Sequence, residues 1–222
     1  LAIWNIVVYD ERSYLSMKGL LVMNVKDYVN LIHMAEKLKD TPRHCFTSGG
    51  RRESVAEHCW RISMMAYFLQ DEFPGIDINK VIKMCIMHDM GEAFTGDIPV
   101  FDKTDADEAR ESSVLNTWVQ SLPEPYRSDL TALYAEMDAL ETLEAKVYKS
   151  MDSLEAVFQH NESDISTWED HEYELNLNYG WDKVVFSEYT KSIRQTLQDE
   201  TKLKIATERD EEGVFKHGEC EW

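Results

Sequence analysis

The sequence lacks any run of about 18 apolar residues, the length that a membrane-spanning helix needs, so we expect no such helix. Its apolar first nine residues lack the basic flank and the small-residue cleavage site of a signal peptide. The four cysteines, Cys45, Cys59, Cys85 and Cys220, include no CxxC pair, and two of them fall in apolar helical patterns, where a free thiol behaves as a small hydrophobe. A reducing, cytoplasmic setting fits these absences best.

Positive charge is also scarce. The 222 residues include 23 Lys and Arg against 42 Asp and Glu, which gives a formal net charge of −19. A negative field repels the phosphates of a nucleic-acid duplex and an anionic membrane surface. We therefore expect no non-specific binding of this protein to nucleic acid or to such a membrane. One stretch, residues 37–61, runs against this trend, with six basic and three acidic residues.

Helical periodicity dominates the chain, and no segment shows a convincing alternation of strand residues. The length and the hydrophobic content of 43% are enough for one medium domain with a buried core, so we predict an all-α, multi-helix bundle. Ser54 and Glu57 form the capping box of one helix. The predicted helices cover about 25–39, 54–69, 79–93, 105–121, 125–137, 138–160 and 182–207. Loops or irregular segments are predicted at 41–50, 94–107 and 166–180.

Three of the predicted helices each place ionisable side chains on an apolar face. His58 and His88 fall on apolar stripes at helical spacing. Asp89 is next to His88, and Asp152 adjoins the buried face of the long helix. Taken singly, each is most simply a hydrogen-bonded core histidine or a salt-bridged carboxylate. Together, two imidazoles and two carboxylates that each need a buried partner suit one divalent cation, such as Mn, Fe, Co, Ni or Zn.

A histidine, a His-Asp pair and a distant aspartate in this order resemble the signature of the HD-domain metal-dependent phosphohydrolases. The segment 88–99, HDMGEAFTGDIP, is more specific than the His-Asp pair alone. With Thr41-Pro42-Arg43, it is similar to the YfbR-type 5′-deoxynucleotidase branch of that superfamily. Further matching segments are 53–58 and 145–152, and the resemblance covers about 25–160.

The resemblance divides the chain into three parts. Residues 1–23, which show weak periodicity, are predicted to be an N-terminal extension. Residues 24–160 are predicted to form the HD phosphohydrolase core, and 161–222 a C-terminal helical extension that ends in an acidic tail. The family implies an all-α bundle of the HD-domain type that works as a homodimer.

The same resemblance implies one bound divalent metal ion, with Mn, Co, Fe, Ni, Zn and Mg all open. Its ligands, matched by position, are His58, His88, Asp89 and Asp152. Glu92 matches the family's catalytic acidic residue, and Asp97 matches a residue near the substrate's sugar and a metal-bound water. Arg43 matches the phosphate-binding arginine. His44 follows it as a further substrate-binding residue, where YfbR has a Trp that helps to select the deoxy sugar, so selectivity for deoxy over ribo sugars is left open.

The predicted function is that of a phosphoric monoester hydrolase that removes the 5′-phosphate from (deoxy)nucleoside monophosphates. Two alternatives stay open: an HD-type phosphodiesterase or pyrophosphohydrolase that acts on another nucleotide, and a non-catalytic, metal-stabilised helical protein that senses a ligand. Ala93 after Glu92 counts against guanosine-tetraphosphate hydrolases, which usually carry an adjacent Glu-Asp after the His-Asp pair. The net charge therefore favours a small substrate, because a mononucleotide needs only a local positive pocket. A nucleic-acid polymer or a membrane would be repelled, so neither is expected as a partner.

Overall fold

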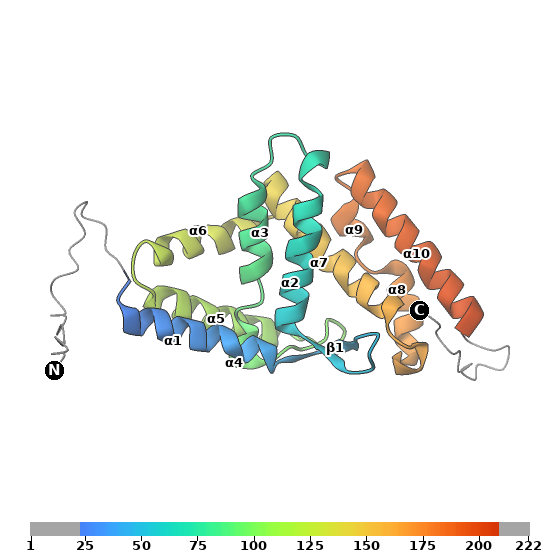
Figure 1. Ribbon diagram of the computed structural model, residues 1–222, viewed down its shortest axis with the longest axis horizontal. Coiled ribbons are helices and arrows are strands. Elements are labelled where there is room, and N and C mark those ends of the chain that lie inside the picture. Colours follow the sequence, from blue (N-terminus) through green and yellow to red (C-terminus); the bar gives the residue numbers. More distant parts are fainter. Residues whose placement is uncertain (1–22, 209–222) are drawn as a thin grey trace, which may run out of the picture.

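The computed structural model describes residues 23–208, which form a helical bundle with one small hairpin (Figure 1). In chain order the helices are α1 (Val25–Glu36), α2 (Val55–Phe68), α3 (Ile78–Met87), α4 (Glu92–Thr95), α5 (Asp105–Ser121), α6 (Tyr126–Ala139), α7 (Leu143–Glu162), α8 (Asp170–Asn178), α9 (Trp181–Val184) and α10 (Glu188–Glu208). The strands are β1 (Pro42–Phe46) and β2 (Arg52–Ser54), and short 3₁₀ helices cover Lys37–Lys39, Gln70–Glu72 and Ile165–Thr167. The all-α class predicted from the sequence is confirmed.

Some sequence predictions fall outside the described residues. These are the N-terminal extension at 1–23, apart from Met23, and the acidic tail from 209 onward, which includes Cys220. Within the described part of the chain, the other three cysteines are buried free thiols, and no helix is long and apolar enough to cross a bilayer.

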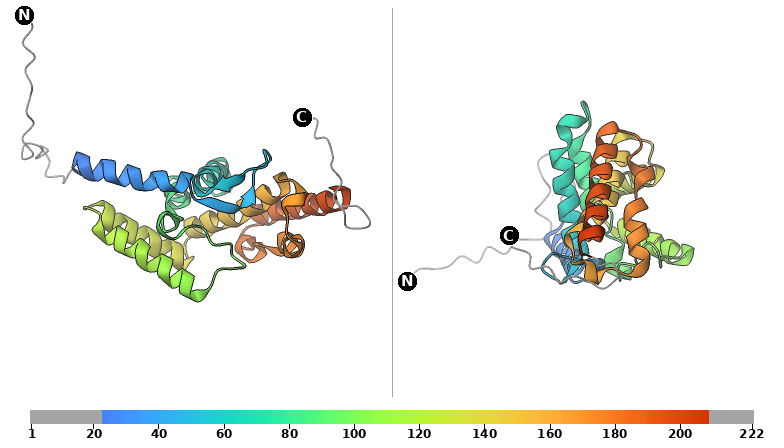
Figure 2. Two further views of the ribbon diagram at one scale, coloured as in Figure 1. Left: turned by 90° about the horizontal axis from the view of Figure 1, so that it is seen from below. Right: turned by 90° about the vertical axis from the view of Figure 1, so that its right-hand side faces the viewer.

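Three helices form the centre of the bundle. α2 and α3 lie side by side and pack across α7 (Figure 1). Their inner faces bury Ile62, Met84, Met151 and Leu154 completely. α10 packs along α7 and α8, and α5 and α6 lie side by side at the other end of the molecule (Figure 2). The bundle therefore brings α2, the end of α3 and α7 to one place.

α2 begins where the sequence predicts. The Ser54 Oγ accepts a hydrogen bond from the backbone N–H of Glu57 (3.3 Å), and Glu57 Oε2 accepts one from the backbone N–H of Ser54 (2.9 Å), which confirms the predicted capping box. Such bonds satisfy backbone donors that have no partner in the first helical turn. Where α2 begins determines which of its side chains face the interior, and His58 is one of these buried side chains.

The segment 41–50, predicted as a loop, instead contains most of an antiparallel hairpin. β1 pairs with β2 across a tight turn in which Gly50 has a φ of +77°. The Thr47 N–H donates to the carbonyl oxygen of Arg51 (2.7 Å), and the Gly50 N–H donates to that of Thr47 (2.9 Å). Strands of five and three residues are too short to show an alternating pattern, so the loop prediction was wrong here.

The helix predicted at 79–93 ends early, at Met87, and His88 is its C-cap rather than a mid-helix residue. The Tyr134 hydroxyl donates to the carbonyl oxygen of Met87 (2.6 Å), which is the acceptor that the Gly91 N–H would use in a continuous α-helix. Tighter turns with hydrogen bonds to the third preceding residue lead from there into α4. A contact from α6 thus interrupts a helix that the local pattern would continue.

The segment 166–180, predicted as irregular, includes α8. Arg194 of α10 is completely buried and holds the end of α8 by donating from Nε to the carbonyl oxygen of Tyr179 (2.8 Å) and from Nη2 to that of Asn176 (2.8 Å). Charge-assisted hydrogen bonds of this kind are stronger than neutral ones. The prediction was wrong because this support comes from a separate helix and leaves no trace in the acidic, aromatic segment itself.

Two other predicted helices differ in detail. The long helix predicted from 138 starts at Leu143, because Leu140 adopts a left-handed conformation with a φ of 51° that ends α6. On the first helix, the apolar side chains of Val25, Val29 and Ile32 are mostly open to solvent (Val29 is 43% exposed), and Leu38, in the 3₁₀ turn that follows, is buried. The first helix therefore contributes little to the core.

Candidate metal centre

The four predicted metal ligands come together at the centre of the bundle. His58 lies on α2, Asp152 lies on α7, and His88 and Asp89 follow the end of α3. Asp152 Oδ1 is 3.2 Å from His58 Nε2 and 3.7 Å from His88 Nε2. Asp89 Oδ2 is 2.9 Å from His88 Nε2 and 3.9 Å from His58 Nε2. Three separate parts of the chain therefore direct two nitrogens and two carboxylates at one point.

Both imidazoles turn the same ring nitrogen toward this point. His58 Nδ1 is 2.5 Å from Glu155 Oε2, and His88 Nδ1 is 3.0 Å from the carbonyl oxygen of Cys85. Only an N–H satisfies these acceptors, so Nε2 of each neutral ring carries a lone pair. His88 Nε2 is buried and has no aligned hydrogen-bond partner. Imidazoles held through Nδ1–H in this way are typical metal ligands, so the donor set fits a divalent cation.

The two aspartates keep their negative charge despite burial. Burial raises the pKa of Asp152, but Lys149, whose Nζ is 2.7 Å from Oδ2, and His58 and His88 in their protonated form together hold this pKa well below its usual range. Burial also raises the pKa of Asp89, but the contact with His88 and the positive charges of protonated His88 and His58 together outweigh burial and lower this pKa. Charged carboxylates beside imidazoles are the ligand types that divalent transition metals accept.

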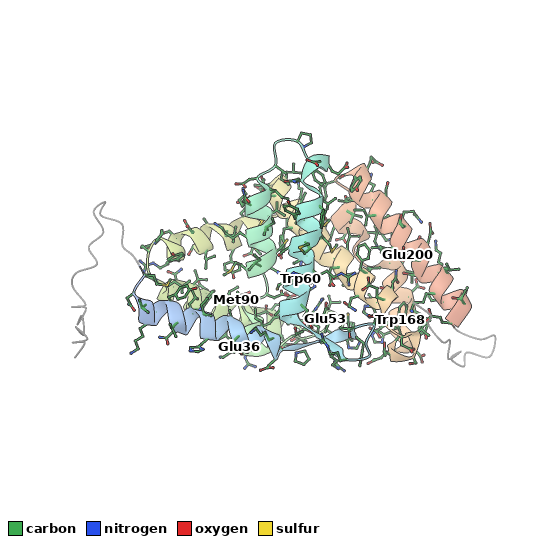
Figure 3. All side chains as sticks on the ribbon, viewed as in Figure 1. Glu36, Glu53, Trp60, Met90, Trp168 and Glu200 are labelled. Carbon is green, nitrogen blue, oxygen red and sulfur yellow. The ribbon has the colours of Figure 1, made fainter. Side chains whose placement is uncertain are left out.

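Two buried glutamates lie beside the centre and were not among the predicted site residues. Glu155 is completely buried, and its Oε2 accepts a hydrogen bond from Arg43 Nη1 (3.0 Å) as well as from His58. Glu53, beside the lower end of α2 in Figure 3, accepts from the same Arg43 nitrogen (2.9 Å). Glu155 lies three residues after Asp152, on neighbouring turns of α7, and this spacing is the signal that could have identified it.

A cavity of about 270 Å³ opens beside the centre. A volume of this order suits a small molecule. All predicted site residues except His88 line it, namely Arg43, His44, His58, Asp89, Glu92, Asp97 and Asp152. The structure thus brings the predicted ligands and the predicted substrate-binding and catalytic residues to one place.

Glu92 is an unusual carboxyl group in the wall of this cavity. It is 7% exposed, and its Oε2 is buried without a hydrogen-bond partner. Burial, with the charges of Asp89 and Asp97, raises the pKa of Glu92 to about 10. Burial likewise raises the pKa of Asp97. A divalent cation would add positive charge nearby and lower both values.

The C-terminal part of the chain contributes to the cavity as well. Glu172, Leu175, Asn176 and Tyr179, from α8 and the turn that follows it, line part of the wall. His44 Nε2 lies 2.8 Å from Glu172 Oε1. His44, which the resemblance links to sugar selection, therefore contacts Glu172, a residue far along the chain. The sequence did not predict that Glu172 lies near the site.

Comparison with known proteins agrees with this geometry. Residues 35–194 match a family model described as HD domain. The human 5′-deoxynucleotidase HDDC2 is 28% identical over 141 residues, which cover 62% of this chain and 68% of that protein. The 5′-deoxynucleotidase hdd1 of Schizosaccharomyces pombe is 29% identical over 189 residues, which cover 75% of this chain and 94% of that protein. The crystal structure of a predicted metal-dependent phosphohydrolase from Magnetospirillum magnetotacticum superposes with a TM-score of 0.67 at 26% identity, over 81% of this chain and 95% of that one.

Proposed function

This chain belongs to the HD domain family, and from that premise we propose that it is a metal-dependent phosphohydrolase that removes the 5′-phosphate from (deoxy)nucleoside monophosphates. One observation carries the proposal: the four candidate metal ligands meet at the edge of a cavity that also holds Arg43 and Glu92. Relatives named 5′-deoxynucleotidases support the substrate class. The similar fold of a predicted metal-dependent phosphohydrolase supports the use of a metal.

A phosphomonoester dianion resists attack by neutral water, so the site must offset its charge. A divalent cation held by His58, His88, Asp89 and Asp152 would withdraw charge from a phosphoryl oxygen and lower the pKa of a bound water. Arg43 offers guanidinium N–H groups beyond the Nη1 that the two buried glutamates accept from. A planar fork of this kind suits a phosphate, and the glutamates hold it at the cavity wall.

Glu92 and Asp97 provide the remaining contacts in the proposed reaction. From the cavity wall, Glu92 can orient or deprotonate the attacking water, or protonate the leaving 5′-oxygen. Asp97, in the same wall, can accept a hydrogen bond from a sugar hydroxyl. A metal-stabilised scaffold that only senses a ligand needs neither group, which favours an enzyme.

Phosphate release from a panel of nucleotides tests the proposed function. We expect release from nucleoside 5′-monophosphates with Mn²⁺, Co²⁺ or Mg²⁺, and no release after chelation, because the charge of the phosphate must be offset. The panel also contains cyclic nucleotides, nucleoside triphosphates and guanosine tetraphosphate. Hydrolysis of one of these without the monophosphates would establish the phosphodiesterase or pyrophosphohydrolase alternative. No hydrolysis of any nucleotide would leave the sensor alternative.

The His44→Trp variant should shift sugar selectivity. We expect it to raise the preference for deoxy over ribo monophosphates by about 10-fold, because a bulkier ring beside the sugar leaves less room for a 2′-hydroxyl. The measurement is kcat/KM for matched ribo and deoxy substrates. His33→Trp, a change at an exposed position on α1, is the control and should keep the wild-type ratio. An unchanged ratio in His44→Trp would remove His44 from the sugar site.

The resemblance to the family also supports two further features of the proposal. We propose that the chain forms a homodimer and acts in the cytoplasm. Light scattering of the purified chain tests the first point, and a monomeric mass would contradict it. Imaging of a tagged chain in cells tests the second.

A further inference from the structure

A second cluster of metal-binding side chains lies in the cavity wall and shares no residue with the four candidate ligands of the centre. His44 on β1, His160 on α7 and Glu172 on α8 meet there. His44 Nε2 is 2.8 Å and His160 Nε2 is 2.7 Å from the same atom, Oε1 of Glu172. The proposed phosphohydrolase reaction gives no role to His160 and gives Glu172 only the contact with His44, so the meeting of all three side chains needs another account.

Glu172 is held in a fixed position as the anion of this cluster. Its side chain is 1% exposed, and its Oε2 accepts a hydrogen bond from the backbone N–H of Glu169 (2.7 Å), within the capping box that begins α8. That bond leaves Oε1 to face the two imidazoles. A buried carboxylate in such a position requires positive charge beside it.

The hydrogen bonding of His160 determines which of its ring nitrogens can bind a cation. Its Nδ1 lies 3.1 Å from the carbonyl oxygen of Ala156, a contact that requires an N–H on Nδ1. In the neutral ring, Nε2 then carries a lone pair, and it faces the Glu172 oxygen. Two acceptors at this distance repel each other unless a cation, either a proton or a metal ion, lies between them. A backbone carbonyl that accepts from the outer ring nitrogen is a usual feature of metal-bound histidine.

We propose that His44, His160 and Glu172 bind a second divalent metal ion, of the zinc or cobalt type. Two histidines and one glutamate form one of the three-ligand sets of zinc sites that keep a coordination position open. The two imidazole side chains are 16% and 14% exposed and line the cavity, which leaves the open position to water or to an anionic group of a bound molecule. This site shares His44 with the proposed sugar contacts, but its binding of a metal ion does not depend on the proposed nucleotidase reaction.

A small rearrangement makes the cluster fit a zinc ion. Tetrahedral bonds of about 2.0–2.1 Å place ligand atoms about 3.3 Å apart, so the present 2.7 and 2.8 Å contacts with Glu172 must lengthen by about half an ångström. His44 and His160 are the partly exposed members and have room to turn. Cys45 Sγ lies 3.3 Å from His160 Nδ1, the ring nitrogen that does not face Glu172. The Cys45 thiol is therefore not one of the proposed metal ligands.

Counting bound metal ions tests the proposal without any activity measurement. The metal-free full-length chain is dialysed against Zn²⁺, and in parallel against Co²⁺, and the bound metal is measured by mass spectrometry. We expect the wild-type chain to bind one more ion per chain than His160→Gln. Asp152→Ala, which disrupts the central site, should lose a different ion, so the double variant should lose both. The visible absorption of bound Co²⁺ should fall in His160→Gln.

Two further variants control this experiment. His171→Gln, which changes a 44% exposed histidine on α8, should keep the wild-type number of ions. His44→Gln should lose the same ion as His160→Gln, which covers the case in which His160→Gln does not fold by circular dichroism. If folded His160→Gln and His44→Gln both bind as many ions as the wild type, a proton joins the cluster and the second metal site does not exist. If only Asp152→Ala loses a bound ion, the proposed central site stands and the proposed second site is wrong.

Discussion

Replacing Glu92 by glutamine should lower the kcat for phosphate release from a nucleoside monophosphate by about 10²- to 10⁴-fold, the usual range for a general acid or base. Glu92 is buried at the cavity wall, and its Oε2 has no hydrogen-bond partner, so the carboxyl group is free to act on a bound substrate or water. Glutamine keeps the size of the side chain but can neither take nor give a proton there. The four candidate metal ligands are unchanged, so we expect the metal content to stay at the wild-type level.

Steady-state kinetics and metal analysis of the same samples measure this effect. Glu141→Gln is the matched control, because it makes the same chemical change at an exposed position between α6 and α7. It should keep the wild-type kcat. A kcat of Glu92→Gln near the wild-type value would exclude a role in proton transfer. A lower kcat accompanied by loss of metal would reassign Glu92 to support of the metal site.

Replacing Glu155 by glutamine should weaken metal binding by about 10- to 100-fold, as is typical when the partner of a metal-bound histidine is removed. Glu155 Oε2 accepts from His58 Nδ1 (2.5 Å) and from Arg43 Nη1 (3.0 Å) while completely buried. A neutral amide accepts these bonds less strongly, so His58 becomes a weaker ligand and is less firmly oriented. Glu155 is therefore a positioning residue, and its loss should appear first in the dependence of the activity on metal concentration.

A titration of metal against a competing chelator measures this affinity. Activity of Glu155→Gln at limiting metal should fall with the affinity and recover in excess metal, whereas excess metal should not restore Asp152→Ala. The control Glu162→Gln lies on the same helix, in a partly exposed ion pair with Arg61, and should bind metal as the wild type does. Unchanged metal affinity in Glu155→Gln would show that the contact with His58 does not support the centre.

Local sequence determined the helical class and the start of α2. Caps and the 3.6-residue period involve neighbours of three or four positions, so Ser54, Glu57 and the apolar stripes could be read directly. The candidate ligands could be selected for the same reason, since each lies on or beside an apolar helix face or in a short matching segment. Their roles as ligands remain proposals, but their convergence makes the metal centre testable.

Only the tertiary structure decided where the helices stop and what surrounds the site. Tyr134 ends α3 at Met87, Arg194 of a separate helix supports α8, and Glu155 joins Arg43 across 112 positions of the chain. Such contacts leave no mark in the spacing of neighbouring residues, because hydrogen bonding and burial depend on which surfaces the fold brings together. The sequence therefore determined which residues could take part in the chemistry, and packing decided which partners hold them.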